Sequence, residues 1–199
     1  MKFYIGYDLS RSHVFDYCIK SISKYKIYYY KIGSSVLNEN VWYRKKTDTD
    51  STEFSVCRFL APYLSDYEGW SVFMDDDFYW KVSPFELEQF CDDSYSVLVC
   101  KHNYVPKKNI KWGNLNQLKY NKKNWSSLML FNNSHPDCKK LDIKYVNESM
   151  ALDLHQFKWT DNVGSIPLEY NFLVGEYENE KNAKALHYTN GFPEDLCIE

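Results

Sequence analysis

The sequence has no apolar run close to the roughly 20 residues that a membrane-spanning helix needs. Its first residues, Met1 to Ile5, lead directly into an expected strand and do not form a signal peptide. The six cysteines lack C-x-x-C spacing, which argues against both a zinc site and a disulfide framework. We therefore expect a soluble, cytoplasmic protein whose cysteines are reduced and lie in its core.

An excess of basic residues is also absent. The formal net charge is −3, whereas general nucleic-acid binding needs a basic surface, so no nucleic-acid partner is expected. The chain has no internal repeat and no long linker. With 199 residues and 44% hydrophobic content it is long enough to bury one core. These features predict a single domain over residues 1–199.

Strand-like and helix-like segments alternate along the chain. Apolar positions at helical spacing predict a helix over 12–23, and a Ser or Thr cap predicts another over 51–64. Expected strands cover residues 2–7, 26–32, 70–74, 94–100 and 125–131. This alternation predicts an α/β fold with a largely parallel or mixed sheet.

Three adjacent acids, Asp75, Asp76 and Asp77, follow the expected strand Trp70 to Met74. In an extended chain alternate side chains share a face, so Asp75 and Asp77 point to one side and Asp76 to the other. Two carboxylates on one face suit Mg²⁺ or Mn²⁺, whose shell the phosphate oxygens of a substrate would complete. The alternative is an acidic turn that precedes a helix capped by Ser83.

The stretch 101–123 contains seven lysines and no acid. One interpretation is a loop that folds over an anionic donor or attracts an anionic acceptor. The other, which we favour, is a solvated lysine loop, because most charge runs are solvated surface.

Five segments together resemble GT-A glycosyltransferases, in particular the branch of glycogenin and the bacterial lipopolysaccharide galactosyltransferases with their small phage-type relatives. The order and spacing of the segments carry the resemblance, which covers nearly the whole chain. The segments are Thr52 to Leu64, Phe73 to Asp77, Asn124 to Asn132, Ile166 to Asn171 and Leu186 to Gly191. The resemblance implies a GT-A fold with a mixed, mostly parallel central sheet flanked by helices.

The resemblance also implies a metal site on the donor diphosphate. Asp75, Asp77 and His187 match the family's ligands for Mn²⁺ (or Mg²⁺), and the imidazole favours Mn²⁺. Gly191 matches a glycine whose backbone lies close to the phosphates. The family usually has a lysine shortly after this glycine, which is absent here, so either Lys184 or the lysine stretch neutralises the phosphates or their neutralisation is weaker.

The first strand resembles the family's site for the base of a UDP-sugar. There Gly6 would allow close approach, Tyr7 would stack on the base and Asp8 would accept from its ring N–H. Asp8 is equally well explained as the cap of the following turn. Arg58 would grip the diphosphate or orient an aspartate, or else be a surface charge on its helix. Asp76 would face the donor ribose or a neighbouring lysine.

The sugar pocket is implied by looser matches. Asn124, Ser126 and Ser127 match positions that face the donor sugar, and Asp153 matches a family acid that touches it. The expected D-Q-D is replaced around Asp153, so His155 either contributes to the pocket or packs in the core.

The implied reaction is sugar transfer from a nucleotide sugar to a glycan or lipid-linked acceptor, with retention of configuration. A divalent cation would stabilise the leaving diphosphate. An inverting enzyme would need a general base, for which Asp153 is the candidate. Two other classes stay open, a nucleotidyltransferase or other Mg²⁺-dependent phosphate enzyme, and a non-catalytic carbohydrate-binding module on a decayed transferase fold.

Overall fold

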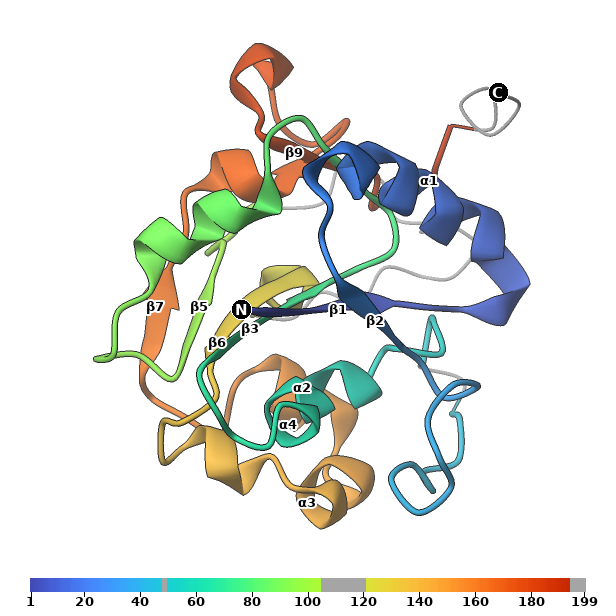
Figure 1. Ribbon diagram of the computed structural model, residues 1–199, viewed down its shortest axis with the longest axis vertical. Coiled ribbons are helices and arrows are strands. Elements are labelled where there is room, and N and C mark those ends of the chain that lie inside the picture. The colour runs from blue at the N-terminus through green and yellow to red at the C-terminus, as the bar shows by residue number, and fades with distance from the viewer. Residues whose placement is uncertain (48–49, 105–120, 194–199) are drawn as a thin grey trace.

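A six-stranded sheet crosses the middle of the protein, with helices on both of its faces (Figure 1). The computed structural model describes residues 1–47, 50–104 and 121–193. The strand order is β2-β1-β3-β6-β5-β7. Strand β6 is antiparallel to both neighbours, while the other neighbouring pairs are parallel. The expected mixed, mostly parallel α/β fold is confirmed.

The strands of this sheet are short, and several 3₁₀ turns join them to the helices. The six strands are β1 (Lys2–Gly6), β2 (Tyr29–Ile32), β3 (Trp70–Met74), β5 (Val97–Val99), β6 (Leu128–Asn132) and β7 (Val163–Ser165). The α-helices are α1 (Ser12–Ile22), α2 (Ala61–Leu64), α3 (Ile143–Glu148) and α4 (Ala151–His155). In the described ranges no helix is long and apolar enough to cross a membrane.

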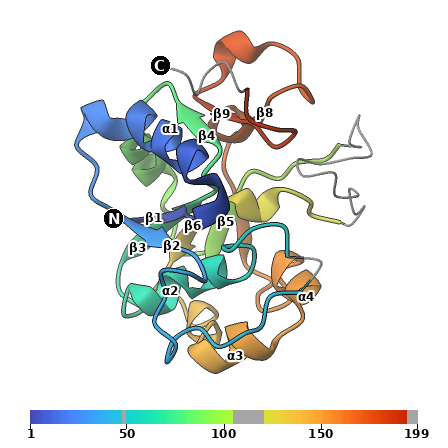
Figure 2. The ribbon, with the colours of Figure 1, turned by 90° about the vertical axis from the view of Figure 1, so that its right-hand side faces the viewer.

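Alternate residues of each strand enter separate cores on the two faces of the sheet. On β3, Val72 and Met74 pack toward α1, whereas Phe73 packs toward α2, α3 and α4. Figure 2 shows this layering, with α1 above the sheet and the other three helices below it. A strand buried on both faces reads as a continuous apolar run, which explains the sequence of β3.

A second, three-stranded sheet has the order β4-β9-β8 and lies on the side of α1. Its strands are β4 (Phe78–Trp80), β8 (Phe172–Leu173) and β9 (Ala185–His187). In the antiparallel pair β4 and β9, Phe78 lies opposite His187. Because β4 begins directly after the three acids, this register brings His187 to them.

The helix expected over 51–64 is wrong in its first half. Residues 52–56 form turns, a 3₁₀ helix covers Cys57–Leu60, and only Ala61–Leu64 are α-helical. Ser55 Oγ accepts from the backbone N–H of Thr52 and hydrogen-bonds its hydroxyl. Such local bonds from Ser and Thr compete with helical hydrogen bonds.

Three expected strands begin earlier in the sequence than the observed ones. Strand β2 begins at Tyr29 because Lys26 has the left-handed φ of 54°. Strand β5 begins at Val97, after a turn in which Asp92 accepts from the N–H of Ser94. The run 125–131 opens with a 3₁₀ turn before β6. Within the lysine stretch, residues 105–120 lie outside the described residues.

Asp137 supports the α2/α3 face through three partners, and its loss is our first prediction. It accepts from Lys140 at 2.5 Å, Thr160 at 2.7 Å and Asn162 at 3.0 Å. Burial would raise the pKa of Asp137, but these donors lower it to about 2. The stability it contributes is therefore present above the unfolded pKa of 3.8 and is lost as pH falls toward 2.

We expect Asp137→Asn to lower the free energy of unfolding by about 1 kcal/mol at neutral pH, because solvent screens part of the effect. The deficit should shrink between pH 4 and pH 2. Urea unfolding at several pH values measures it, with the exposed Asp161→Asn as the control. A deficit that does not change with pH would show that the charge of Asp137 is not the cause.

Candidate metal and donor site

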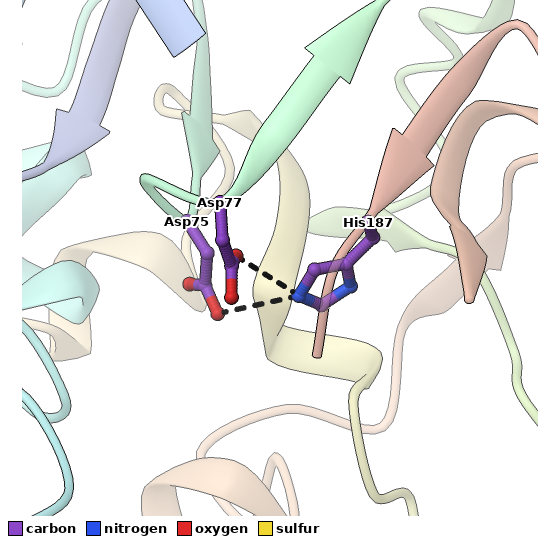
Figure 3. A group of neighbouring side chains, drawn as sticks. All are labelled: Asp75, Asp77 and His187. Atoms are coloured by element: carbon purple, nitrogen blue, oxygen red, sulfur yellow. Dashed lines mark ion pairs between the residues drawn. The ribbon is translucent and has the colours of Figure 1, made fainter. Parts of the chain in front are cut away.

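Two strand ends deliver the candidate metal ligands. Asp75 and Asp77 follow β3, and His187 is the last residue of β9. Figure 3 shows both carboxylates turned toward the imidazole. His187 Nε2 lies 3.2 Å from Asp77 Oδ1 and 4.0 Å from Asp75 Oδ2. The structure therefore brings together residues that are more than a hundred positions apart in the sequence.

These separations fit a divalent cation. One ligand atom from each of the three residues lies within 4.8 Å of the others. In an octahedral shell with bonds of about 2.1 Å, neighbouring ligand atoms are about 3 Å apart and opposite ones about 4 Å. The donor set of two carboxylates and one imidazole suits Mn²⁺.

Unsatisfied oxygens provide a second test of fit. Oδ1 of Asp75 and Oδ1 of Asp77 are buried and make no hydrogen bond of normal geometry within the described residues, although Arg58 Nη1 lies 2.7 Å from the first and His187 Nε2 3.2 Å from the second. Burial raises the pKa of Asp75, against the opposing charge of Arg58. Burial would raise the pKa of Asp77 too, but His187 outweighs it and lowers the value to about 2. A cation among these oxygens would satisfy them.

The tautomer of His187 is set from behind by Asn171. The side-chain amide of Asn171 donates to Ser127 Oγ at 2.9 Å, so its Oδ1 faces His187 Nδ1 at 2.8 Å. Nδ1 therefore carries a proton, and in the neutral ring that a metal would bind, Nε2 presents a lone pair to the two carboxylates. The ring is also stacked on Phe78, with centroids 4.5 Å apart. A lone pair that faces carboxylates is the arrangement of a metal ligand.

Asp76 points away from the candidate metal ligands, as alternation on the strand predicts. It is fully buried and binds Arg11, whose Nε lies 2.9 Å from Oδ2 while Nη2 contacts Oδ1. Burial raises the pKa of Asp76 and Arg11 opposes the rise. Arg11 Nη2 also lies 3.9 Å from Asp77 Oδ2. The partner of Asp76 is thus an arginine, and the expected contact with a lysine is wrong.

Arg58 is buried beneath the acids and is no surface charge. Its Nη1 lies 2.7 Å from Asp75 Oδ1 and donates to the carbonyl of Ser126 at 2.9 Å. The guanidinium lies over the rings of Phe54 and Phe73. Of the expected roles, the structure favours orientation of Asp75, although one nitrogen makes the contact and the pair is not bidentate.

The residues expected to bind the base have structural partners. Asp8 Oδ1 accepts from the N–H and hydroxyl of Ser10, and Oδ2 accepts from the N–H of Glu53. Asp8 is therefore the cap of a 3₁₀ turn, the alternative role left open. A Cβ on Gly6 would lie 2.7 Å from the Phe54 ring, so packing explains this glycine. Tyr7 is half-buried, with Lys31 Nζ 4.0 Å from its ring centre.

The residues expected around the sugar are divided between two places. Ser127 Oγ donates to the carbonyl of Asn124 and accepts from the amide of Asn171, the residue that holds His187. Ser127 and Asn124 are thus connected to His187 through Asn171. Ser126 Oγ hydrogen-bonds His155 Nδ1 at 2.7 Å. Asp153 pairs with Lys158 at 2.6 Å, and no described contact joins it to the metal ligands. Of these two residues of helix α4, His155 is therefore the one that contacts a residue expected around the sugar.

Gly191 requires glycine for its backbone, since its φ is +120°. It follows β9 closely and hydrogen-bonds the carbonyl of Tyr188. Lys184, the expected phosphate partner, instead donates to Glu86 at 2.9 Å and to Tyr170 at 3.1 Å. Lys184 is thus engaged in a surface cluster of its own.

Arg11 and Asn171 complete the site and were missed as functional residues. Asn171 was visible as the last residue of the family segment that begins at Ile166, a signal that pointed to it without giving its role. Nothing in the sequence near Arg11 signals that it binds Asp76, because the pair is 65 positions apart.

No family model matches the chain. The Arabidopsis thaliana protein named Protein CDI is 36% identical over 203 residues, an alignment that covers 96% of this chain and 78% of the relative.

Solved structures of similar shape are glycosyltransferases. The bifunctional glycosyltransferase WbbM superposes with a TM-score of 0.62 at 15% identity, over 96% of this chain and 46% of WbbM. The galactosyltransferase LgtC, in complex with donor and acceptor sugar analogues, gives 0.59 at 12% identity, over 94% of this chain and 87% of LgtC. GlyE of Streptococcus pneumoniae gives 0.58 at 13% identity, over 98% of this chain and 55% of GlyE. The chain spans about half of WbbM and of GlyE, and it has the GT-A fold.

Proposed function

The chain belongs to the family of the Arabidopsis thaliana Protein CDI, and we propose that it is a metal-dependent glycosyltransferase that uses a nucleotide sugar, with UDP as the nucleotide. The observation that carries the proposal is the convergence of Asp75, Asp77 and His187 within 4.8 Å at the edge of a GT-A sheet. A decayed transferase would have no need to keep His187 in the tautomer that binds a metal.

Each part of the site has a definite task in this reaction. Asp75, Asp77 and His187 would hold Mn²⁺ or Mg²⁺, which when bound stabilises negative charge on a leaving diphosphate. Arg58 and Arg11 fix the orientation of Asp75 and Asp76, and their charges oppose the rise in pKa that burial causes. Asn171 holds His187 through Nδ1. Because these groups are positioned before the substrate binds, little reorganisation is needed during the reaction.

Residues other than the metal ligands would contact the phosphates and the donor sugar. Gly191 would let the backbone approach the diphosphate without a side chain. Asn124 and Ser127 would face the sugar. We further propose retention of configuration, because Asp153 is paired with Lys158 and no described contact brings it to the metal ligands as a general base. The acceptor is a glycan or a lipid-linked sugar.

Thermal unfolding with UDP and Mn²⁺ tests the function. At about 100-fold excess over Kd, a ligand stabilises the folded state by about 2.7 kcal/mol, which for this size raises Tm by roughly 5–10 °C. We expect this shift for the wild type only when both ligands are present, because each completes the site of the other. Asp77→Ala should abolish the shift, since it removes a metal ligand.

The exposed Asp161→Ala is the matched control and should keep the full shift. Hydrolysis of a panel of UDP-, GDP- and CMP-sugars would then identify the donor. If UDP and Mn²⁺ have no effect on the wild type, alone or together, and no nucleotide sugar is hydrolysed, the proposal is wrong and the decayed module is favoured.

A further inference from the structure

His102 is a second buried histidine near the metal ligands that the site described so far does not use. It follows β5, which is parallel to β3 and separated from it by the antiparallel β6. The carboxyl ends of β3 and β5 therefore lie at the same edge of the sheet. His102 is close enough to His187 for the charge of that residue to affect its pKa.

The imidazole of His102 has one satisfied and one unsatisfied nitrogen. Its Nδ1 lies 2.7 Å from the hydroxyl of Tyr177, whereas its Nε2 is buried and has no hydrogen-bond partner among the described residues. The residue is only 5% exposed. Buried polar atoms without a partner are rare and call for an explanation. The metal ligands do not provide one, because His102 is not among the residues that form the candidate cation site.

The surroundings of His102 fix its position and are rich in polar groups. Its backbone carbonyl accepts from the indole N–H of Trp125 at 2.9 Å. The rings of Tyr104 and Tyr177 lie within 6.3 Å of the imidazole, centre to centre. Asn124, expected to face the sugar, donates to the hydroxyl of Tyr104 at 2.6 Å. The ring of Tyr104 thus connects His102 to Asn124, one of the residues expected around the sugar.

The chemistry of the free nitrogen favours a neutral hydroxyl as its partner. No carboxylate of the described chain forms an ion pair with His102, and burial lowers its pKa to about 3, so the ring is neutral. The proton of a neutral ring is on one nitrogen, so Nε2 is either a donor or an acceptor. A hydroxyl satisfies both forms because it donates and accepts. A phosphate oxygen only accepts and would favour a charged ring.

We propose that His102 is a specificity-determining residue that hydrogen-bonds a sugar hydroxyl through Nε2, with Tyr177 as the residue that positions its ring. The proposal rests on the glycosyltransferase function and deepens it, since it assigns a sugar contact to a residue that neither holds the metal nor faces the phosphates. The hydroxyl belongs either to the donor sugar or to a sugar acceptor, and the same variants distinguish the two.

His102→Phe is the main test, because phenylalanine fills a similar space without a polar atom. We expect Tm to be unchanged or higher, since the unsatisfied Nε2 is removed, and the affinity for UDP with Mn²⁺ to stay within twofold. A donor contact predicts at least a tenfold fall in kcat/KM for hydrolysis of UDP-glucose or UDP-galactose, whichever the wild type uses. An acceptor contact predicts unchanged hydrolysis and at least a tenfold fall in kcat/KM for transfer to glucose, galactose or maltose.

Two further variants separate the proposed role from a structural one. His102→Gln keeps a donor and an acceptor and should retain more sugar-dependent activity than His102→Phe. If His102→Phe fails to fold, His102→Gln takes its place in the test. Tyr177→Phe should give a weaker loss of the same kind. If UDP binds the wild type while both His102 variants keep hydrolysis and transfer, this proposal alone is overturned. If the wild type binds no UDP and hydrolyses no nucleotide sugar, the proposed function fails first, and this proposal falls with it.

Discussion

Replacement of Arg11 by methionine is expected to lower the free energy of unfolding by about 3–5 kcal/mol, because it leaves the carboxylate of Asp76 buried without its partner. Asp76 is fully buried and its pair with Arg11 is made through both carboxylate oxygens. Methionine keeps much of the apolar stem of Arg11, so the variant removes mainly the charge. Urea unfolding at neutral pH measures the loss.

The double variant Arg11→Met, Asp76→Leu separates the charge from the packing. Because both charges are removed together, no buried ion is left, and replacement of such pairs by apolar residues is often neutral or stabilising. We therefore expect most of the lost stability to return. A single variant within 1 kcal/mol of the wild type would show that Asp76 takes up a proton and tolerates the loss of Arg11.

Five of the six strands of the central sheet and helix α1 were predicted, because their signals are local, whereas the second sheet and helices α3 and α4 were not. Strand β3 was predicted with its observed ends, since the mostly apolar run Trp70–Met74 is bounded by Gly69 and Asp75. The helix over 51–64 was not, because its pattern of apolar residues belongs to a set of turns. There, buried residues such as Phe54 and Cys57 pack against the sheet from turns and a 3₁₀ helix. Tertiary packing overrides local propensity in such segments.

The three candidate metal ligands were found in the sequence for two separate reasons. Alternation along an extended strand was enough to place Asp75 and Asp77 on one face and Asp76 on the other. His187 came from the family resemblance alone, and only the register of β4 with β9 shows how it reaches the acids. Arg11 and Asn171 depend on pairings between distant segments, which no local pattern records.

Two residues expected in the site, Lys184 and Asp153, are instead bound to other partners. Lys184 was expected at the phosphates, but Glu86 and Tyr170 hold it. Asp153 matched a family acid by its distance along the chain, yet its carboxylate pairs with Lys158. Spacing along the sequence does not show which way a side chain points. Residue type and spacing show which interactions a side chain is able to make. Which of them it makes depends on the neighbours that the fold brings next to it.

Asn171→Leu is expected to weaken Mn²⁺ binding by about 10–100-fold, the usual effect of removing a residue that orients a metal ligand. Leucine has a similar volume but cannot accept from His187 Nδ1, so the imidazole loses its fixed tautomer and orientation. The distance from Nδ1 to Asn171 Oδ1 is 2.8 Å, and Asn171 is fully buried. Titration of Mn²⁺ in the presence of UDP, followed by calorimetry, measures the effect.

Two matched variants show which hydrogen bond of Asn171 matters. Asn171→Asp still accepts from His187 but no longer donates to Ser127, whereas Ser127→Ala removes the acceptor of the amide and leaves Asn171 in place. If the tautomer of His187 is what supports the metal, Asn171→Asp should keep far more affinity than Asn171→Leu, and Ser127→Ala should lose little. Equal losses in Asn171→Leu and Asn171→Asp would show instead that the amide acts by packing the ends of β6 and β8 together, and that His187 needs no orienting partner.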